Sequence, residues 1–163
     1  MQTANKNVER NIERNIETSS IVKKHGDANM FSRMVMGEPL AGFAAVMSIR
    51  EGYAARILKS ASHFFGVTDA RIQRIAQVPA STASRLEKNK ARIDPSASER
   101  VFRMSTVTRM AIDVFQNEAL AINWMRQPNR ALGDAAPLDL MDTEPGSVSV
   151  RQILSAIATG GVA

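Results

Sequence analysis

Apolar residues recur at helical spacing along most of this chain, and no stretch alternates strictly between apolar and polar residues as a half-buried strand does. Short breaks at glycine and proline residues separate the apolar segments. The pattern therefore predicts an all-α fold whose core begins near Pro39. We expect helices over Leu40–Lys59, Asp69–Gln77, Ala80–Lys88, Pro95–Phe115, Asn117–Gln127 and Val148–Ala158, with a short helical turn over Leu138–Met141.

The N-terminal residues 1–37 carry a different pattern. A short repeat, NVER, NIER and NIET, runs from Asn7 to Thr18 and would place Val8, Ile12 and Ile16 on one face of a helix. Three apolar side chains bury too little surface to hold a helix by themselves. We therefore expect residues 1–37 to form a flexible or partly helical arm.

Two adjacent predicted helices have the features of a helix-turn-helix. Ile72, Ile75 and Ala76 supply the inner face of the first helix, and Val78 fills the turn. Pro79 then stands in the first turn of the second helix, where proline is tolerated. Gln77 is a departure from the usual pattern, because this turn often holds glycine.

The outward face of the second helix carries short polar and basic side chains, since Ala83 and Leu86 face inward. Serine and threonine can approach base edges or phosphates, while arginine and lysine reach further. An antiparallel helix pair with a solvated basic face is the alternative. The candidate DNA-binding residues are Ser81, Thr82, Ser84, Arg85, Lys88, Lys90 and Arg92.

Charge along the chain favours the DNA-binding interpretation. Residues 38–104 carry 11 basic and 6 acidic residues, whereas residues 105–163 carry 4 basic and 6 acidic ones. A basic middle followed by an acidic end is typical of a protein in which one part alone meets a polyanion.

Composition excludes several kinds of site. The chain has no cysteine and only two histidines, so neither a disulfide framework nor a zinc site is expected, and we expect no metal and no cofactor. The longest apolar run, Leu40–Ile49, is shorter than the roughly 20 residues that span a bilayer. We therefore expect no membrane association and a cytoplasmic location.

Three nearby carboxylates, Asp139, Asp142 and Glu144, are candidates for acid–base chemistry. They lack a base partner, a metal-ligand set and a glycine-rich phosphate loop, so helix caps and turn contacts are their expected roles. The sequence predicts that the protein is not an enzyme and has no catalytic residues.

The C-terminal segment reads WMRQPNRALGDAAPLDLMDTEPGSVSVRQILSAIATGGVA, from Trp124 to Ala163. In its order of features the chain resembles antitoxins of the Xre/ParS/MbcA family, the partners of RES-domain toxins. There a helix-turn-helix precedes a stretch of the form W…PN.ALGG..PLDLLDT..G and a tail that ends in glycine and valine. The resemblance covers roughly residues 71–163. The matching residues are Trp124, Pro128, Asn129, Ala131, Leu132, Gly133, Pro137, Leu138, Asp139, Leu140, Asp142, Thr143, Gly146, Gly161, Val162 and Ala163.

The resemblance implies an Xre-like helix-turn-helix DNA-binding module over residues 38–104 and a small helical toxin-binding module over residues 105–163. It implies an antitoxin of a type II toxin–antitoxin system that covers the active site of a cognate NAD-degrading RES toxin. Repression of its own operon at operator DNA is also expected, by a homodimer, since such readers meet paired half-sites. The implied toxin-binding residues are Arg151, Leu154, Ile157, Gly160, Gly161, Val162 and Ala163.

Three alternatives stay open from the sequence. The chain could be a helix-turn-helix transcriptional regulator without a toxin partner. It could also be an inhibitor whose DNA-binding module has decayed, which the departure at Gln77 favours. Finally, the apolar residues of the last helix could complete the protein's own core. Those residues are Val150, Ile153, Leu154 and Ile157.

Overall fold

A computed structural model of the chain describes residues 29–160, and all regular secondary structure in that range is helical. The all-α prediction is confirmed, since the described residues form only two isolated β-bridges outside the helices. No helix among them is long and apolar enough to cross a bilayer. The α-helices are α2 (Met30–Met36), α3 (Gly42–Glu51), α4 (Ile57–Phe65), α5 (Asp69–Ala76), α6 (Ala80–Lys88), α7 (Pro95–Phe115), α8 (Glu118–Arg126) and α9 (Glu144–Ala158), with 3-10 turns η1 (Arg130–Leu132) and η2 (Pro137–Asp142).

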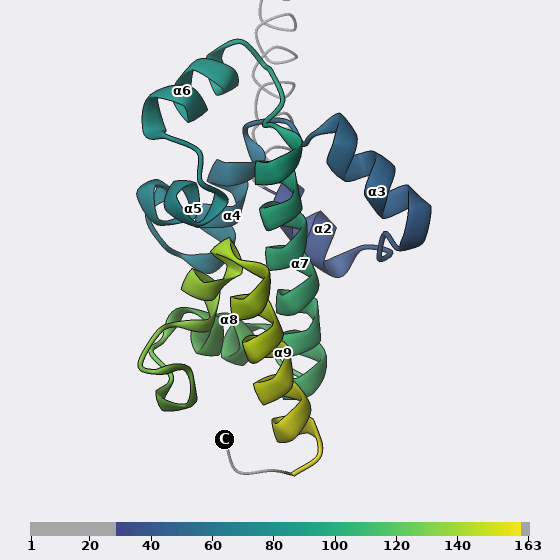
Figure 1. The fold of residues 1–163 in the computed structure, drawn as a ribbon, viewed down its shortest axis with the longest axis vertical. Coiled ribbons are helices and arrows are strands. Elements are labelled where there is room, and N and C mark those ends of the chain that lie inside the picture. Colours follow the sequence, from purple (N-terminus) through teal and green to yellow (C-terminus); the bar gives the residue numbers. More distant parts are fainter. Residues whose placement is uncertain (1–28, 161–163) are drawn as a thin grey trace, which may run out of the picture.

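The 21-residue helix α7 runs through the whole molecule (Figure 1). The Asp94 side chain caps its first turn by accepting a hydrogen bond from the Ala97 N–H at 2.9 Å, and Pro95 occupies the start of the helix. Helices α2, α3 and α5 pack on α7, as do α8, η2 and α9 from the C-terminal part. One hydrophobic core therefore extends from Phe31 to Leu154.

The expected N-terminal arm is wrong for residues 30–36, because α2 belongs to the core. Phe31 and Val35 have no exposed surface, and the Phe31 ring packs against the rings of Phe64 and Phe65 with centroids 5.3 and 5.4 Å away. The core thus begins at Phe31 and not near Pro39. A seven-residue helix shows too little periodicity to reveal a partner some thirty residues further along the chain. The repeat of residues 7–18 lies outside the described residues.

The single helix predicted over Leu40–Lys59 is also wrong, because the chain breaks at Gly52. Gly52 has φ +80°, and a Cβ there would meet the Ile93 carbonyl oxygen at 2.3 Å. The following residues are extended and pair with the segment before α7. The Ile93 N–H donates to the Tyr53 carbonyl at 2.9 Å, and the Ala55 N–H donates to the Ala91 carbonyl at 2.9 Å. This long-range pairing replaces a helical turn.

The turn between α5 and α6 has the geometry that the helix-turn-helix prediction requires. Gln77 adopts the left-handed conformation with φ 57°, so glutamine stands in a position that favours glycine. The Gln77 N–H donates to the Arg74 carbonyl, and the Val78 N–H donates to the Gln73 carbonyl at 2.9 Å. Helix α5 ends in this way without glycine, at the cost of local strain.

The last helix begins four residues earlier than predicted. The sequence predicts that Pro145–Gly146 interrupts the helical pattern, but Pro145 lies in the first turn of α9, where its missing N–H costs nothing. The Thr143 side chain caps the helix by accepting a hydrogen bond from the Gly146 N–H at 3.3 Å. A Cβ on Gly146 would lie 2.3 Å from the Leu140 carbonyl oxygen, so η2 and α9 meet through this glycine.

We expect Gln77→Gly to raise the free energy of unfolding by about 1 kcal/mol, because glycine adopts the left-handed conformation without the penalty of a Cβ. The control is Gln73→Gly in the preceding turn of α5, which should lower stability by about 1 kcal/mol. Urea denaturation of both variants measures the difference. A loss of stability in Gln77→Gly would show that the turn is unstrained.

Candidate DNA-binding and partner-binding surfaces

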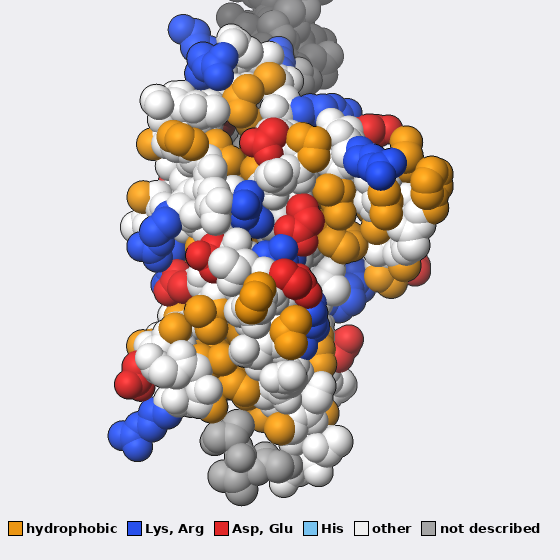
Figure 2. Space-filling view, in the orientation of Figure 1, with side chains coloured by type: hydrophobic (Ala, Val, Ile, Leu, Met, Phe, Trp, Pro, Cys, Tyr) orange, Lys and Arg blue, Asp and Glu red, His pale blue; other side chains and the backbone are white. Residues whose placement is uncertain are grey.

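Helix α6 lies at one end of the molecule and packs on α5 (Figure 1). Ala83 is its buried residue, Leu86 is half-buried, and Val78 fills the turn, as predicted. Figure 2 shows basic side chains at this end of the molecule. The exposed polar and charged side chains of α6 are those of Ser81, Ser84, Arg85, Glu87 and Lys88, while Thr82 is half-buried.

The two predicted contacts after α6 have different surroundings. Lys90 is exposed, has a left-handed φ of 52°, and lies two residues after the end of α6. Arg92 is exposed as well, but its Nη1 donates to the Gly52 carbonyl at 2.5 Å. The Arg92 guanidinium therefore holds the end of α3 against the loop that follows α6.

Two other arginines of the helix-turn-helix face η2. Arg71 of α5 binds Asp139 through two hydrogen bonds, Nε to Oδ1 at 2.9 Å and Nη2 to Oδ2 at 3.0 Å. Arg74 Nη2 binds the same carboxylate at 3.0 Å, and Arg71 also reaches the Arg126 carbonyl at 3.3 Å. A single carboxylate thus neutralises charge on α5 and joins the helix-turn-helix to the C-terminal part, leaving α6 as the more exposed basic element.

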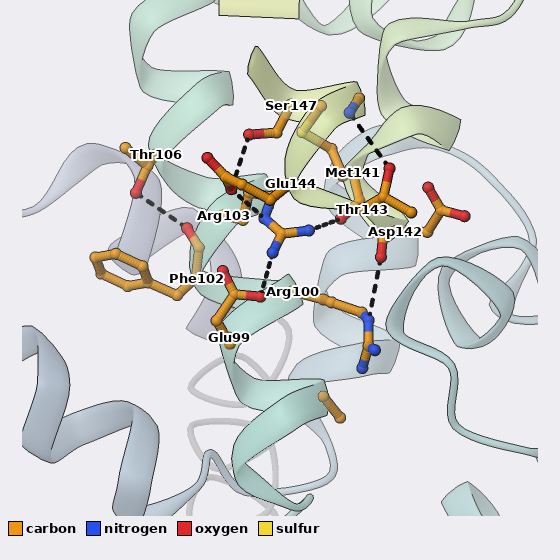
Figure 3. A network of polar contacts seen from close by, with 12 residues as sticks. Glu99, Arg100, Phe102, Arg103, Thr106, Met141, Asp142, Thr143, Glu144 and Ser147 are labelled. Carbon is orange, nitrogen blue, oxygen red and sulfur yellow. Dashed lines mark hydrogen bonds and ion pairs between the residues drawn. The ribbon is translucent and has the colours of Figure 1, made fainter. Parts of the chain in front are cut away.

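A second network of charges surrounds Arg103 of α7 (Figure 3). The Arg103 side chain is only 10% exposed, and it contacts Glu99 at 2.5 Å, the Met141 carbonyl at 3.0 Å and Glu144 at 3.2 Å. Arg151 of α9 adds a bond to Glu144 at 2.7 Å. The network borders an open cavity of about 420 Å³ between the start of α7 and the η2–α9 junction.

These contacts show that the acidic residues of the C-terminal motif, which the sequence offered as candidates for acid–base chemistry, have structural roles. Asp139 and Glu144 are each paired with two arginines, and the Asp142 carbonyl accepts a hydrogen bond from Arg100 Nε at 3.3 Å. The hydrogen bond from Arg151 lowers the pKa of the Glu144 carboxyl from its ordinary value of 4.5, and the charge of Arg103 acts in the same direction. Both carboxylates therefore serve as ion-pair partners for arginines of neighbouring helices.

The structure divides the predicted toxin-binding residues of α9 among different environments. Leu154 and Val150 are fully buried in the core, where α9 packs on η2 and α7, so Leu154 offers no surface to a partner in this structure. Ile157 and Ile153 are half-buried and form an exposed apolar flank of α9. Gly160 is exposed, while Gly161, Val162 and Ala163 lie outside the described residues.

Arg151 and Ile157 do not share a face. They are six residues apart, which places them about 120° apart around the helix axis. The 37% exposed Arg151 side chain is tied to Glu144, so its contact is internal. Sequence periodicity identifies an apolar stripe on α9. The packing of α7 and η2 on this helix decides which edge of the stripe remains exposed to solvent.

Sequence reasoning missed a second exposed apolar surface. Helix α3 presents Phe43, Val46 and Met47 to solvent, and Phe43 is 74% exposed. The spacing i, i+3 and i+4 is visible in the sequence, but spacing alone does not show whether another element covers that face.

Comparisons with known proteins match both halves of the chain. Residues 44–105 match the antitoxin Xre-like helix-turn-helix domain, and residues 110–160 match the antitoxin Xre/MbcA/ParS C-terminal toxin-binding domain. A curated relative named Antitoxin Xre from Yersinia enterocolitica is 29% identical over 120 residues, which cover 73% of this chain and 81% of the relative.

Two further relatives carry the same name, Antitoxin Xre. The protein from Photorhabdus laumondii is 28% identical over 113 residues, covering 69% of this chain and 76% of the relative. The protein from Pseudomonas putida is 28% identical over 113 residues, covering 69% of each chain. The resemblance noted in the sequence is thereby confirmed.

We expect Asp139→Asn to lower the free energy of unfolding by about 1 kcal/mol, because it removes the charge that holds Arg71 and Arg74 to η2. Asp142→Asn in the same motif is the matched control, and it should change stability by less than about 0.5 kcal/mol. Urea denaturation at neutral pH measures both. Equal effects would show that the Asp139 ion pairs add nothing to stability.

The lowered pKa of Glu144 makes the contribution of its ion pairs dependent on pH. Because the folded-state pKa lies below the unfolded value of 4.5, this contribution is complete above that pH and is lost as the pH falls through the folded-state pKa. In an NMR titration of the Glu144 side-chain carboxyl, we expect a midpoint below 4.5 that rises in Arg151→Gln. An unchanged midpoint in the variant would contradict the assignment of the shift to Arg151.

Proposed function

We propose that this chain, which matches both the antitoxin Xre-like helix-turn-helix domain and the Xre/MbcA/ParS toxin-binding domain, neutralises a RES-domain toxin. In this proposal the toxin degrades NAD, and the antitoxin covers the toxin's active site. The antitoxin also represses its own operon as a homodimer. One observation carries the proposal: a domain matched as toxin-binding presents a half-exposed apolar flank on its last helix.

The toxin-facing surface is the edge of α9 that carries Ile153 and Ile157. These side chains lie one turn apart and remain half-exposed because α7 and η2 cover the neighbouring face. Gly160 follows them at φ +78° with open space around its Cα, and the small residues Gly161, Val162 and Ala163 continue the chain. Small side chains of this kind suit entry into a narrow active-site cleft.

The DNA-facing surface is the outer side of α6. Ser81, Ser84, Arg85 and Lys88 are exposed together there, and Lys90 follows directly. Arg71 is bound to Asp139 and only 23% exposed, whereas Arg74, which binds the same carboxylate, stays 70% exposed and adds to the basic charge of α6 and its C-terminal loop. In this proposal Arg85 and Lys88 supply the longer contacts, while Ser81, Thr82 and Ser84 approach the bases.

The toxin-facing surface is tested by co-expressing the chain with the product of the neighbouring gene and measuring growth and cellular NAD. We expect NAD to fall with the neighbour alone and to recover with this chain. Ile157→Lys should abolish the recovery. Val148→Lys is the matched control, because Val148 is 37% exposed on the opposite side of the same helix, and it should retain the recovery.

The DNA-binding surface is tested by measuring binding to a duplex of the operon's own promoter. Arg85→Ala and Lys88→Ala should each weaken binding by roughly 10- to 100-fold while leaving neutralisation intact. Ile157→Lys should bind DNA as the wild type does. No promoter binding by the wild type would favour an inhibitor with a decayed DNA-binding module, and wild-type affinity in both α6 variants would contradict the assigned surface. A harmless neighbour would favour a regulator without a toxin.

A further inference from the structure

Helix α3 exposes the largest group of apolar side chains in the described part of the chain. Leu40, which precedes the helix, is 46% exposed, Phe43 is 74% exposed, and Val46 and Met47 are each 40% exposed. Figure 2 shows hydrophobic side chains gathered over α3. Contiguous exposed patches of this kind mark interaction sites, whereas isolated exposed apolar residues do not.

The outward position of this stripe is built into the fold. Ala45, on the other side of α3, is buried, and Ile49 is half-buried beside it. The helix therefore already packs on α7 through its inner face, and the stripe of Phe43, Val46 and Met47 forms a second apolar face. A helix that is apolar on both sides is typical of buried positions.

We infer that the outer face of α3 is the surface through which two copies of this chain associate. The homodimer itself is part of the proposed function, on which this inference rests. A two-fold interface brings the same patch of both copies together, so its centre must carry no charge. Residues 39–49 contain no charged side chain, and the centre of the patch meets that requirement.

The two ends of the patch carry exposed charges, among them a complementary pair. Glu38 lies before the helix, and Arg50 and Glu51 lie in its last turn; all three are exposed. Two α3 helices that cross antiparallel about a two-fold axis place Glu38 of one copy near Arg50 of the other, and this happens at both ends. The antiparallel arrangement also opposes the two helix dipoles favourably.

The position of α3 connects this association to DNA reading. The end of α3 is held to the loop after α6 by the Arg92 bond to the Gly52 carbonyl and by the backbone pairing of Ala54 with Arg92. Pairing two α3 helices therefore sets the relation between two α6 helices, as paired half-sites require. A standard interface takes roughly 20 to 30 residues a side, whereas this patch consists of one helix and the residues just before it, so the dimer should be weak and depend on concentration.

Sedimentation velocity of the full chain between about 1 and 200 µM tests the inference. We expect the wild type to pass from monomer to dimer over this range, and Phe43→Glu to raise the dissociation constant at least tenfold. Leu120→Glu is the matched control, because Leu120 is 58% exposed on α8, and it should dimerise as the wild type does. Circular dichroism melts check that each variant is folded.

A charge exchange tests the antiparallel arrangement directly. Glu38→Arg and Arg50→Glu should each weaken the dimer, and the double variant should restore it. A dimer that persists in Phe43→Glu would overturn the assigned surface while leaving the homodimer intact. A wild type that stays monomeric at all concentrations would overturn both, and would indicate that another segment or the toxin covers α3. Neither result depends on the toxin or on DNA, so the antitoxin proposal stands or fails separately.

Discussion

The burial of α7 on nearly all sides is the constraint on which the rest of the structure depends. Val101, Met104 and Val107 have no exposed surface, and helices from both halves of the chain lie against them. The small residues Ala97 and Ala111 are fully buried near the two ends, where neighbouring elements approach closely. Thr108 is buried too, and its hydroxyl donates to the Met104 carbonyl at 2.6 Å, which satisfies its hydrogen-bonding group.

Since α7 passes from the helix-turn-helix into the C-terminal part, the two share one core and are joined by arginines at its edges. Arg71 binds Asp139 of η2, and Arg103 binds both the Met141 carbonyl and Glu144. Arg126 of α8 donates to the Phe65 carbonyl at 3.3 Å. Each contact connects a residue before position 105 with one after it. A partner that displaced η2 or α9 would therefore disturb the support of α5, the helix on which α6 rests.

Helices α3 and α9 show how the same pattern serves two purposes. Each carries an apolar stripe that is wider than its neighbours can cover, so part of the stripe is core and part is surface. On α9 the covered residues are Val150 and Leu154, and the uncovered ones are Ile153 and Ile157. On α3 the inner Ala45 is covered, while Phe43 is not. The uncovered edges are where the proposed toxin and the proposed second copy would bind.

Local chemistry determined much of this protein. Helices α5, α6 and α7 have the predicted bounds to within one residue, because proline, capping aspartate and apolar spacing act within a few residues of one another. Gln77 departs from the glycine that this turn often holds, yet it adopts the left-handed conformation; the C-terminal motif carries the resemblance to the matched toxin-binding domain. Three other features needed partners far along the chain: the core position of Phe31, the break at Gly52 and the burial of Leu154. Periodicity shows that a face is apolar, but only the tertiary structure decides whether another part of the protein covers it.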